Sequence, residues 1–511
     1  MKMGLRMKNL GVILLAGASG LLLAGTAAAA DLPTKKAAPA VEYVKVCGAY
    51  GAGFFTIPGS DTCLKIGGVV RFEENFRSNA PSAANQAGLN LAGTLYPRDA
   101  TFSRTRVYLN VDARSQTDEG ELRSFFSFRD TQDTLPGGPF GGGKLAATTP
   151  TSPRASAGYN QGSSSNSFRL SQGYVQWAGI QAGVAHSFFD FYTHDYELQD
   201  LTMGASDQPL VMFGYTAKFG GGFSASASAE DPRARQIGDS TADIGIGNNA
   251  PKSSTQAAYL TYGAVKSPDV VGNLHYEGGW GSAQVSGALH QVDSAPIFGC
   301  IGATSSNCGA GNIYSATVPL GFQPSSVWGY AVNGGVKLKL DALGAGDSFT
   351  VQGSYATGAT DYVNSLNYAT GMSSVYSSNQ VVGVPANDAF VLPNGSIGLS
   401  KEWGVFAGIQ HYWVPTVRSS LFGSYMQVSN PTAAQVLSAG ADNARAWNVG
   451  FNAIWSPIKA LDIGAELVYE NLNLNGANTL KGTNPLGVSV TPYIPANSND
   501  LRARLRIQAT F

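Results

Sequence analysis

The last residues of the chain form one amphipathic strand that runs to the carboxyl terminus. Its apolar face holds every second residue, counted back from the end: Phe511, Ala509, Ile507, Leu505, Ala503 and Leu501. Its other face holds Thr510, Gln508, Arg506, Arg504 and Arg502. A strand of a membrane barrel turns its apolar face to lipid and its polar face to a wet lumen. A strand that ends on an aromatic residue is also typical of the closing strand of bacterial outer-membrane barrels.

The amino-terminal residues have the pattern of an export signal. Basic residues precede a mostly apolar run over 10–23, and small residues follow at 28–30. This order predicts a signal peptide over 1–30, with the mature chain starting at Asp31. A retained membrane anchor is the alternative, but the apolar run is short and interrupted by glycines. After residue 30, no apolar run reaches the roughly 18 residues that a spanning helix needs.

The composition agrees with an exported barrel. Charged residues are only 13% of the chain, whereas soluble domains average roughly 25%. Low charge without long apolar runs is what alternating lipid-facing strands produce. Without the signal the chain carries 30 basic and 34 acidic residues, a net charge of −4. This balance gives no reason to expect a nucleic-acid partner.

Strand-like segments recur along the whole chain. They are 68–76, 102–116, 119–129, 168–177, 179–186, 210–218, 222–230, 269–277, 279–292, 328–341, 347–357, 403–413, 416–428, 445–456, 460–472 and 500–511. The segment from Ala460 shows the period of two, because Leu461, Ile463 and Ala465 alternate with Asp462 and Glu466. The segments number about sixteen, and an even number fits a single-chain barrel. We therefore expect an all-β transmembrane antiparallel β-barrel.

The connections alternate between short and long. Short turns follow the even-numbered segments, as at 219–221, while long Gly/Ser/Asn/Pro-rich loops such as 131–167 and 358–401 follow odd-numbered ones. Outer-membrane barrels have short periplasmic turns and long external loops. A soluble β-sandwich also has many short strands, but it gives no reason for this alternation. Tryptophans near segment ends fit the aromatic girdles of a membrane barrel; they are Trp177, Trp280, Trp328, Trp403, Trp413, Trp447 and Trp455.

The four cysteines form two pairs that are close in sequence. Cys47 and Cys63 flank a Gly/Pro-rich stretch, and Cys300 and Cys308 flank a Gly/Ser loop. In an oxidising periplasm both pairs are plausible disulfides. Free thiols or a metal site are the alternative. No CxxC motif is present, and the five scattered histidines make no ligand cluster, so no metal and no cofactor are expected.

Several motifs carry a family resemblance. The stretch Cys47-Gly-Ala-Tyr50 through Pro58-Gly, followed by Thr62-Cys63-Leu-Lys-Ile through Arg71, resembles the amino-terminal signature of the alphaproteobacterial porin family. The stretches 106–117 and 119–123 are similar to that family's second and third strands. The resemblance covers about 41–511. It implies a sixteen-stranded, homotrimeric general porin that passes small hydrophilic solutes and ions by diffusion. Outer-membrane lipids and lipopolysaccharide would surround it.

In porins of this build the third external loop folds into the lumen, and here that loop corresponds to 187–209. Its aromatics could pack against the inner wall while its carboxylates set an ion field. The aromatics are Phe188, Phe189, Phe191, Tyr192 and Tyr196, and the carboxylates are Asp190, Asp195, Glu197, Asp200 and Asp207. An ordinary solvated loop is the alternative.

The opposite wall of the pore would come from the first strands and the last. Their inward positions are Arg71, Arg104, Arg106, Arg123, Arg502, Arg504 and Arg506. With the acidic loop, they predict a field across the lumen that orients dipolar solutes and disfavours apolar ones. Sequence does not say which arginines reach the narrowest point.

Two other functions compete with a general pore. A channel specific for one solute class, such as a sugar, is the stronger rival. Enzyme activity is the weaker one, because no G-x-S-x-G elbow occurs in its required context, and adjacent His194 and Asp195 would point in opposite directions on an extended chain. The expected organisation is a signal peptide over 1–30, a periplasmic extension over 31–66, and a barrel over 67–511.

Overall fold

The computed structural model describes most of the chain after residue 44. The described residues are 45–78, 101–134, 168–237, 258–260, 262–295, 322–363, 375–377, 380–382, 387–392, 394–437, 443–474, 478–479, 482–483, 489–490, 493–494 and 497–511. Residues 46–511 form one compact unit, and the description below concerns that unit. The predicted signal peptide, and the extension as far as residue 44, lie outside the described residues.

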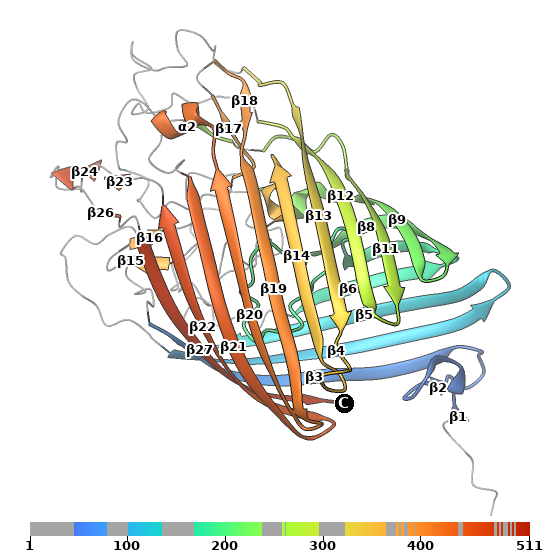
Figure 1. Ribbon diagram of the computed structural model, residues 1–511. Coiled ribbons are helices and arrows are strands. Elements are labelled where there is room, and N and C mark those ends of the chain that lie inside the picture. The colour runs from blue at the N-terminus through green and yellow to red at the C-terminus, as the bar shows by residue number, and fades with distance from the viewer. Residues whose placement is uncertain are drawn as a thin grey trace, which may run out of the picture. The chain divides into compact units, whose positions relative to one another are not determined.

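Sixteen antiparallel strands of the described residues close into a barrel (Figure 1). They are β3 (Cys63–Arg77), β4 (Thr101–Thr117), β5 (Gly120–Asp133), β6 (Arg169–Trp177), β7 (Ile180–His186), β8 (Pro209–Gly220), β9 (Phe223–Glu230), β11 (Asp269–Gly278), β12 (Gly281–Val292), β13 (Val327–Lys339), β14 (Ser348–Thr357), β19 (Lys401–Val414), β20 (Val417–Ser429), β21 (Ala444–Ile458), β22 (Leu461–Leu474) and β27 (Asn497–Thr510). Each pairs with its neighbours in chain order.

The last strand closes the barrel against the first. β27 pairs with β3 from Arg502 opposite Arg77 to Thr510 opposite Val69. Beyond Thr510, Phe511 and Gly68 exchange backbone hydrogen bonds of 3.0 and 3.1 Å. The predicted closing strand is therefore confirmed, and among the described strands the barrel sheet itself has no free edge to pair with another chain.

All sixteen predicted segments are strands, with differences at their ends. β3 begins at Cys63, earlier than the predicted start at Gly68, because Cys63 and Leu64 pair with β4. β5 continues to Asp133, which lies opposite Arg104, so the first residues of the predicted loop 131–167 belong to the sheet. In both places the neighbouring strand supplies hydrogen-bond partners that local sequence does not reveal.

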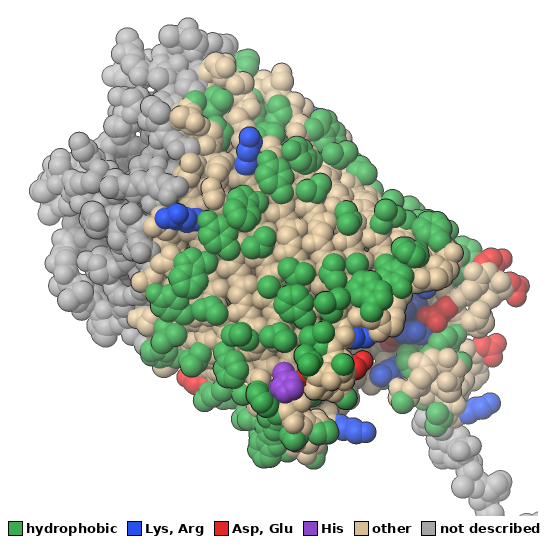
Figure 2. Space-filling view, viewed as in Figure 1, with side chains coloured by type: hydrophobic (Ala, Val, Ile, Leu, Met, Phe, Trp, Pro, Cys, Tyr) green, Lys and Arg blue, Asp and Glu red, His purple; other side chains and the backbone are tan. Residues whose placement is uncertain are grey.

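The two faces of the strands differ as a membrane barrel requires. In β21, buried and exposed residues alternate over most of the strand. Its exposed positions include Trp447, Val449, Phe451 and Trp455. Hydrophobic side chains spread over the outer surface of the sheet (Figure 2). So large an exposed apolar surface marks contact with lipid. All seven tryptophans are exposed, and the rings of Trp447 and Tyr469 are 5.5 Å apart on neighbouring strands.

Short connections join strands at one end of the barrel, as between β19 and β20 or β21 and β22. The smaller elements are β1 (Lys45–Val46), β2 (Phe55–Thr56), β10 (Ala258–Tyr259), β15 (Val375–Ser377), β16 (Gln380–Val382), β17 (Ala389–Val391), β18 (Ile397–Leu399), β23 (Asn478–Thr479), β24 (Gly482–Thr483), β25 (Ser489–Val490), β26 (Tyr493–Ile494), η1 (Gly48–Tyr50), η4 (Pro232–Ala234), η5 (Thr360–Tyr362) and α2 (Thr432–Leu437). No described helix has the length and hydropathy to cross a membrane.

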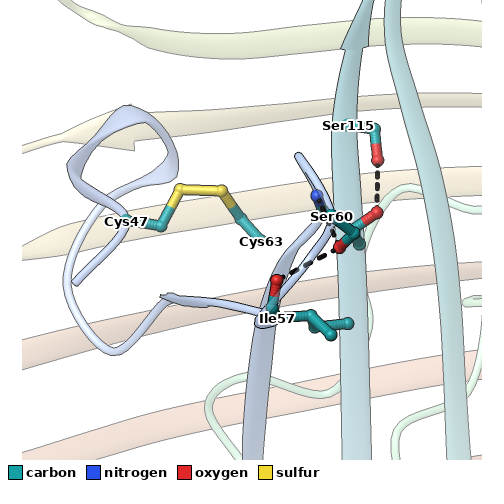
Figure 3. Close-up of a disulfide and its surroundings, with 6 residues drawn as sticks. Cys47, Ile57, Ser60, Cys63 and Ser115 are labelled. Carbon is teal, nitrogen blue, oxygen red and sulfur yellow. Dashed lines mark hydrogen bonds between the residues drawn. A yellow bond between two sulfur atoms is a disulfide. The ribbon is translucent and has the colours of Figure 1, made fainter. Parts of the chain in front are cut away.

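A disulfide joins the segment before the barrel to its first strand (Figure 3). Cys47 bonds to Cys63, the first residue of β3, as one of the two predicted pairs requires. Next to Cys63, the Thr62 hydroxyl lies 3.0 Å from the Ser115 hydroxyl of β4, so this segment is held against two strands. Cys300 and Cys308 lie outside the described residues.

Candidate functional site

The segment between β7 and β8, residues 187–208, lies against the inner wall of the barrel and is called the inserted loop below. Side chains that point inward from distant strands bind its backbone. The Gln352 Oε1 of β14 accepts the Tyr192 N–H at 3.0 Å. The Asn452 Nδ2 of β21 donates to the Tyr196 carbonyl at 2.6 Å. Such bonds replace the water that a solvated loop would use, so the wall itself specifies the position of the loop.

Aromatic side chains pack the inserted loop onto the wall. The Tyr192 ring stacks on Phe406 of β19 with centroids 4.0 Å apart. The Tyr196 hydroxyl lies 2.8 Å from Ser348 Oγ and 2.9 Å from Thr350 Oγ1 of β14. Phe189 is fully buried. Buried apolar area and satisfied hydroxyls together hold the loop inside the barrel.

One close approach between loop and wall depends on glycine. A Cβ on Gly404 of β19 would lie 2.6 Å from the Gly204 Cα of the loop. Gly204 itself has a φ of +72°, a conformation that side chains rarely adopt. The Gly204 carbonyl also accepts hydrogen bonds from Gln352 and Ser354 of β14. Glycine at both positions therefore lets the two backbones meet.

Two of the five predicted pore acids do not project into water, which corrects the expectation from sequence. The Glu197 side chain has no exposed area. It accepts backbone N–H bonds from Leu201 at 2.6 Å and Thr202 at 2.9 Å, and His194 Nδ1 lies 3.1 Å away. Glu197 therefore organises the loop from within, because an inward acid satisfies donors that the turn leaves open.

Asp190 is the second buried acid. Its Oδ2 accepts the Gln208 N–H at 2.9 Å, which joins the two ends of the loop. Its Oδ1 lies 3.3 Å from Arg235 Nη2, and Arg235 is itself completely buried. A buried, paired carboxylate cannot present its charge to a solute in the lumen. Sequence patterning placed Asp190 with the water-facing acids because acids in a loop are usually solvated.

The other three acids retain contact with solvent. The Asp195 side chain is 52% exposed and pairs with Lys337 Nζ of β13 at 3.0 Å. Asp207 is partly exposed, with its Oδ1 2.7 Å from His186 Nδ1. Burial would raise the pKa of Asp200, but His194 and the guanidiniums of Arg506 and Arg504 lower it below its usual value. The seam arginines therefore favour the charged form of Asp200.

Arginines gather on the strands that meet at the barrel seam. Register places Arg71 of β3 opposite Arg106 of β4, and Glu73 of β3 opposite both Arg104 and Arg506. The Glu73 side chain is fully buried, and its Oε1 lies 2.7 Å from Arg506 Nη2. One carboxylate among several guanidiniums leaves this part of the wall positively charged. Figure 1 shows β27 beside β3 at this seam.

The arginine wall also contacts the inserted loop directly. Arg504 Nη1 and Arg506 Nη2 both donate hydrogen bonds to the Leu198 carbonyl. The Leu198 N–H in turn donates to the Glu466 carboxylate of β22. The loop therefore reaches from its base between β7 and β8 to the seam on the other side of the barrel, and charge-assisted bonds fix its tip.

Two predicted arginines belong to other groups. Arg123 of β5 shares the Asp112 carboxylate with Arg114, at 3.0 and 2.8 Å, near the short β4–β5 turn. Arg502 of β27 is buried beside Glu470 and Asp500 at 2.8 and 3.0 Å. Ion pairs with these close acids largely compensate the charges of Arg123 and Arg502.

Sequence reasoning did not select several charged residues that lie near these sites. Arg129 of β5 lies opposite Tyr108 of β4 in the sheet register. Lys337 and Lys339 line a cavity of about 430 Å³ beside Asp195 and Glu277. The alternation of the two strand faces could have identified these charged residues. Arg129, for example, lies six residues from Arg123 on β5, an even number, and so belongs to the same face. Sequence also missed the cluster of His186 with Asp190 and Asp207, because these residues are separated along the chain.

Comparisons with known proteins point to one family. Residues 31–494 match the porin subfamily. The chain is 30% identical over 278 residues to porin Omp2b of Brucella suis, covering 54% of this chain and 64% of that protein. It is 31% identical over 276 residues, with the same coverage, to porin Omp2b of Brucella suis biovar 1. The match thus spans somewhat less than two thirds of these relatives.

A solved structure supports the fold. The outer-membrane channel DcaP of Acinetobacter baumannii aligns with a TM-score of 0.54 and 16% identity, covering 89% of this chain and 99% of that chain. At this identity the likeness concerns the fold alone. Together with the closed sixteen-stranded barrel and the match over most of the sequence, these findings show that the chain belongs to the porin subfamily.

Proposed function

We propose that this protein is a general diffusion porin, a water-filled channel for small hydrophilic solutes and ions. The single observation that carries the proposal is the inserted loop, which partly fills the barrel and reaches the seam arginines through Leu198. Sixteen-stranded barrels of porins enclose a lumen too wide for wall side chains to fill. A loop that narrows this lumen turns a wide opening into a size-selective one.

Charge on the two sides of the narrowed lumen gives the channel its preference. Arg71, Arg104 and Arg106 supply positive charge from the wall, and Asp195 and Asp200 supply negative charge from the loop. Opposite charges across a narrow, low-dielectric passage create a transverse field. Water and dipolar solutes align in that field, whereas an apolar solute displaces ordered water without replacing its bonds. We assign ion selectivity to these five residues.

Family membership and the barrel fold imply an outer-membrane location. The remaining features of the assembly are part of the proposal. Residues 1–30 act as a cleaved signal peptide, and three copies associate among outer-membrane lipids and lipopolysaccharide. The periplasmic lead predicted over 31–66 ends at residue 62, because β3 begins at Cys63. The sequence pattern supports the signal, and the family supports the trimer. The position of the Cys47–Cys63 bond at the start of β3 supports the periplasmic lead.

Swelling of proteoliposomes tests the proposed function. Purified protein is reconstituted into vesicles, which are diluted into isotonic sugars of increasing size. A general porin gives swelling rates that fall smoothly with solute size and do not saturate with concentration. Rapid uptake of one sugar, saturating and inhibited by that sugar's relatives, would instead establish a substrate-specific channel. Vesicles that do not swell with any solute, although the barrel is folded, would overturn the pore.

A further inference from the structure

Three side chains at the base of the inserted loop form a potential ligand set for a metal ion. His186 ends β7, Asp190 lies early in the loop, and Asp207 precedes β8. One ligand atom from each lies within 4.8 Å of the other two. Of the described residues, only this group of histidine, cysteine or carboxylate side chains meets that distance. We infer that His186, Asp190 and Asp207 bind a Zn²⁺ ion that fastens together the two ends of the inserted loop.

Unused bonding capacity at this site supports a ligand. The His186 Nδ1 and Asp207 Oδ1 are 2.7 Å apart. Both atoms are inaccessible to solvent, and neither has a hydrogen-bond partner among the described residues. Their contact is short but not aligned as an N–H···O bond. Buried polar atoms in proteins are nearly always satisfied, and a cation between the two would use both lone pairs.

The other ligand is already oriented by its surroundings. Asp190 Oδ2 accepts the Gln208 N–H, and Oδ1 lies beside Arg235. An ionised carboxylate offers about four lone-pair directions, so these contacts leave room for a metal bond. Arg235 does not cancel the site's charge, because it also lies 3.5 Å from Asp361. Asp190, Asp207 and Asp361 thus contribute three carboxylates against the single guanidinium of Arg235. This excess of negative charge attracts a divalent cation.

Gln172 can provide the outer contact that a histidine ligand needs. Its amide nitrogen, Nε2, lies 2.6 Å from His186 Nε2, so the amide must flip to present its oxygen there. A ligating imidazole usually donates its second N–H to a fixed acceptor. With the amide oxygen turned to His186, Gln172 accepts that proton and leaves Nδ1 bare for the metal. Oxygen and nitrogen of a glutamine amide exchange places at little cost, because their shapes are nearly the same.

The donor set favours zinc over calcium. Zn²⁺ accepts imidazole nitrogen and carboxylate oxygen together, about 2.0–2.2 Å away, in four-coordinate sites. Calcium prefers six to eight oxygens. Three protein ligands leave one position for water, and the side chains of His186 and Asp207 are both partly exposed. Tetrahedral zinc places two ligand atoms roughly 3.3 Å apart, so His186 and Asp207 must separate slightly on binding.

Binding would stabilise the point where the loop leaves the barrel. Without metal, the ends of the loop are joined there by the Ser187 N–H to Gln208 carbonyl bond of 3.3 Å and by the Gln208 N–H to Asp190 bond. A metal bridge adds a bond between the ends of the loop that thermal motion does not easily break. Only the expected consequence of binding rests on the proposed function. That consequence is a smaller fluctuation of the open-channel current when zinc is present.

The test measures zinc binding to the full-length protein in detergent, by calorimetry and by metal analysis after dialysis. We expect one Zn²⁺ per chain, retained in excess Ca²⁺, and an affinity at least about tenfold lower in His186→Gln and in Asp207→Asn. His411→Gln is the matched control. His411 also pairs with an aspartate, Asp347, at 2.6 Å, but lies in no three-residue ligand group of the described chain. The His411→Gln protein should therefore bind zinc as the unchanged protein does.

Other results would overturn the inference. These are an unchanged protein that binds no zinc, variants that bind it normally, or displacement by equimolar Ca²⁺. If both variants fail to fold, X-ray absorption of the zinc-loaded unchanged protein decides, because oxygen-only coordination excludes His186. Conductance without zinc separates the two proposals. A conducting protein that binds no zinc refutes only the metal site, and a zinc-binding protein that does not conduct refutes only the pore.

Discussion

Glu73 and Arg506 form a buried ion pair across the seam where the last strand closes on the first, with Glu73 Oε1 2.7 Å from Arg506 Nη2. The same oxygen lies 3.3 Å from Arg504 Nη1. Both arginines also donate to the Leu198 carbonyl of the inserted loop. One carboxylate therefore connects barrel closure, the charge of the wall and the position of the loop.

Replacing Glu73 with glutamine should affect both stability and selectivity. Glu73→Gln leaves Arg504 and Arg506 without their shared acid, and breaking a buried pair typically costs about 3–5 kcal/mol. We expect a lower thermal unfolding temperature and an ion preference that shifts toward anions. Heat-dependent gel mobility and reversal potentials measure the two effects. Glu74→Gln, on the adjacent and partly exposed position of β3, should change both much less.

Removing the two loop acids Asp195, which is exposed, and Asp200, which is partly buried, should shift ion preference toward anions. Asp195→Asn and Asp200→Asn each remove a negative charge near the passage, and Asp195→Asn also frees the charge of Lys337. A partly screened charge is worth roughly 0.5–1 kcal/mol, or about a two- to fivefold change in the permeability ratio. Reversal potentials under a salt gradient measure it. Asp118→Asn, on the exposed β4–β5 turn, should have no effect, and equal shifts in all three variants would contradict the assignment.

A methyl group at Gly404 should displace the inserted loop. In Gly404→Ala the new Cβ would lie 2.6 Å from Gly204 Cα, so one backbone must move. We expect altered single-channel conductance and faster proteolysis of the loop. Gly334→Ala on β13 is the control, because no atom lies within 4 Å of its added Cβ. A normal conductance in Gly404→Ala would show that the loop does not rest on this wall.

The sequence predicted the strands of this barrel better than the contacts of its loop. The period of two at Leu461, Ile463 and Ala465 reports which side of a strand meets lipid, and this is a local property. The burial of the Glu197 side chain, in contrast, is not a local property of the sequence. The side chain is buried because its carboxylate satisfies backbone donors of Leu201 and Thr202, which depends on how the loop turns. Period alone cannot distinguish such an acid from Asp195, which is exposed.

The same limit applies to clusters built from distant residues. His186 and Asp207 are neighbours only because β7 pairs with β8, with His186 opposite Pro209. Arg506 meets Glu73 only because the barrel closes. In contrast, the cysteine pair 47–63 was readable from sequence because short separation and export already favour a disulfide. Register and closure are therefore the information that patterning lacks.

The stability of the inserted loop against the barrel wall should depend on pH through the protonation of His194. Burial lowers the pKa of His194, but Glu197 at 3.1 Å, with Asp200 and Asp207, raises it to about 9 from 6.5. A raised pKa means that the protonated ring stabilises the folded loop fully below pH 6.5, and that this contribution is lost as pH rises through 9. We expect proteolysis of the loop to increase between pH 8 and about 10. In His194→Gln this step should be missing; its persistence would assign the change to another group.

Breaking the Cys47–Cys63 disulfide should loosen the amino-terminal segment and leave the barrel intact. The bond closes a loop with a sequence separation of 16, for which chain entropy predicts about 3 kcal/mol. β3 continues well beyond Cys63 through pairing with β4 and β27. In Cys47→Ser we expect cleavage by added protease within 48–62 and an unchanged unfolding temperature of the barrel. A barrel that no longer folds would mean that the disulfide helps to establish β3.

The central claim is that the barrel encloses a water-filled passage whose charge comes from the seam arginines and from Asp195 and Asp200 of the loop. Single-channel current in a planar bilayer, with reversal potential under a salt gradient, tests it most directly. The account predicts a large ohmic conductance that is insensitive to added sugars, with a reversal potential that moves toward anion preference in Asp195→Asn and Asp200→Asn. A small conductance blocked by one solute, or a reversal potential unchanged in both variants, would contradict it.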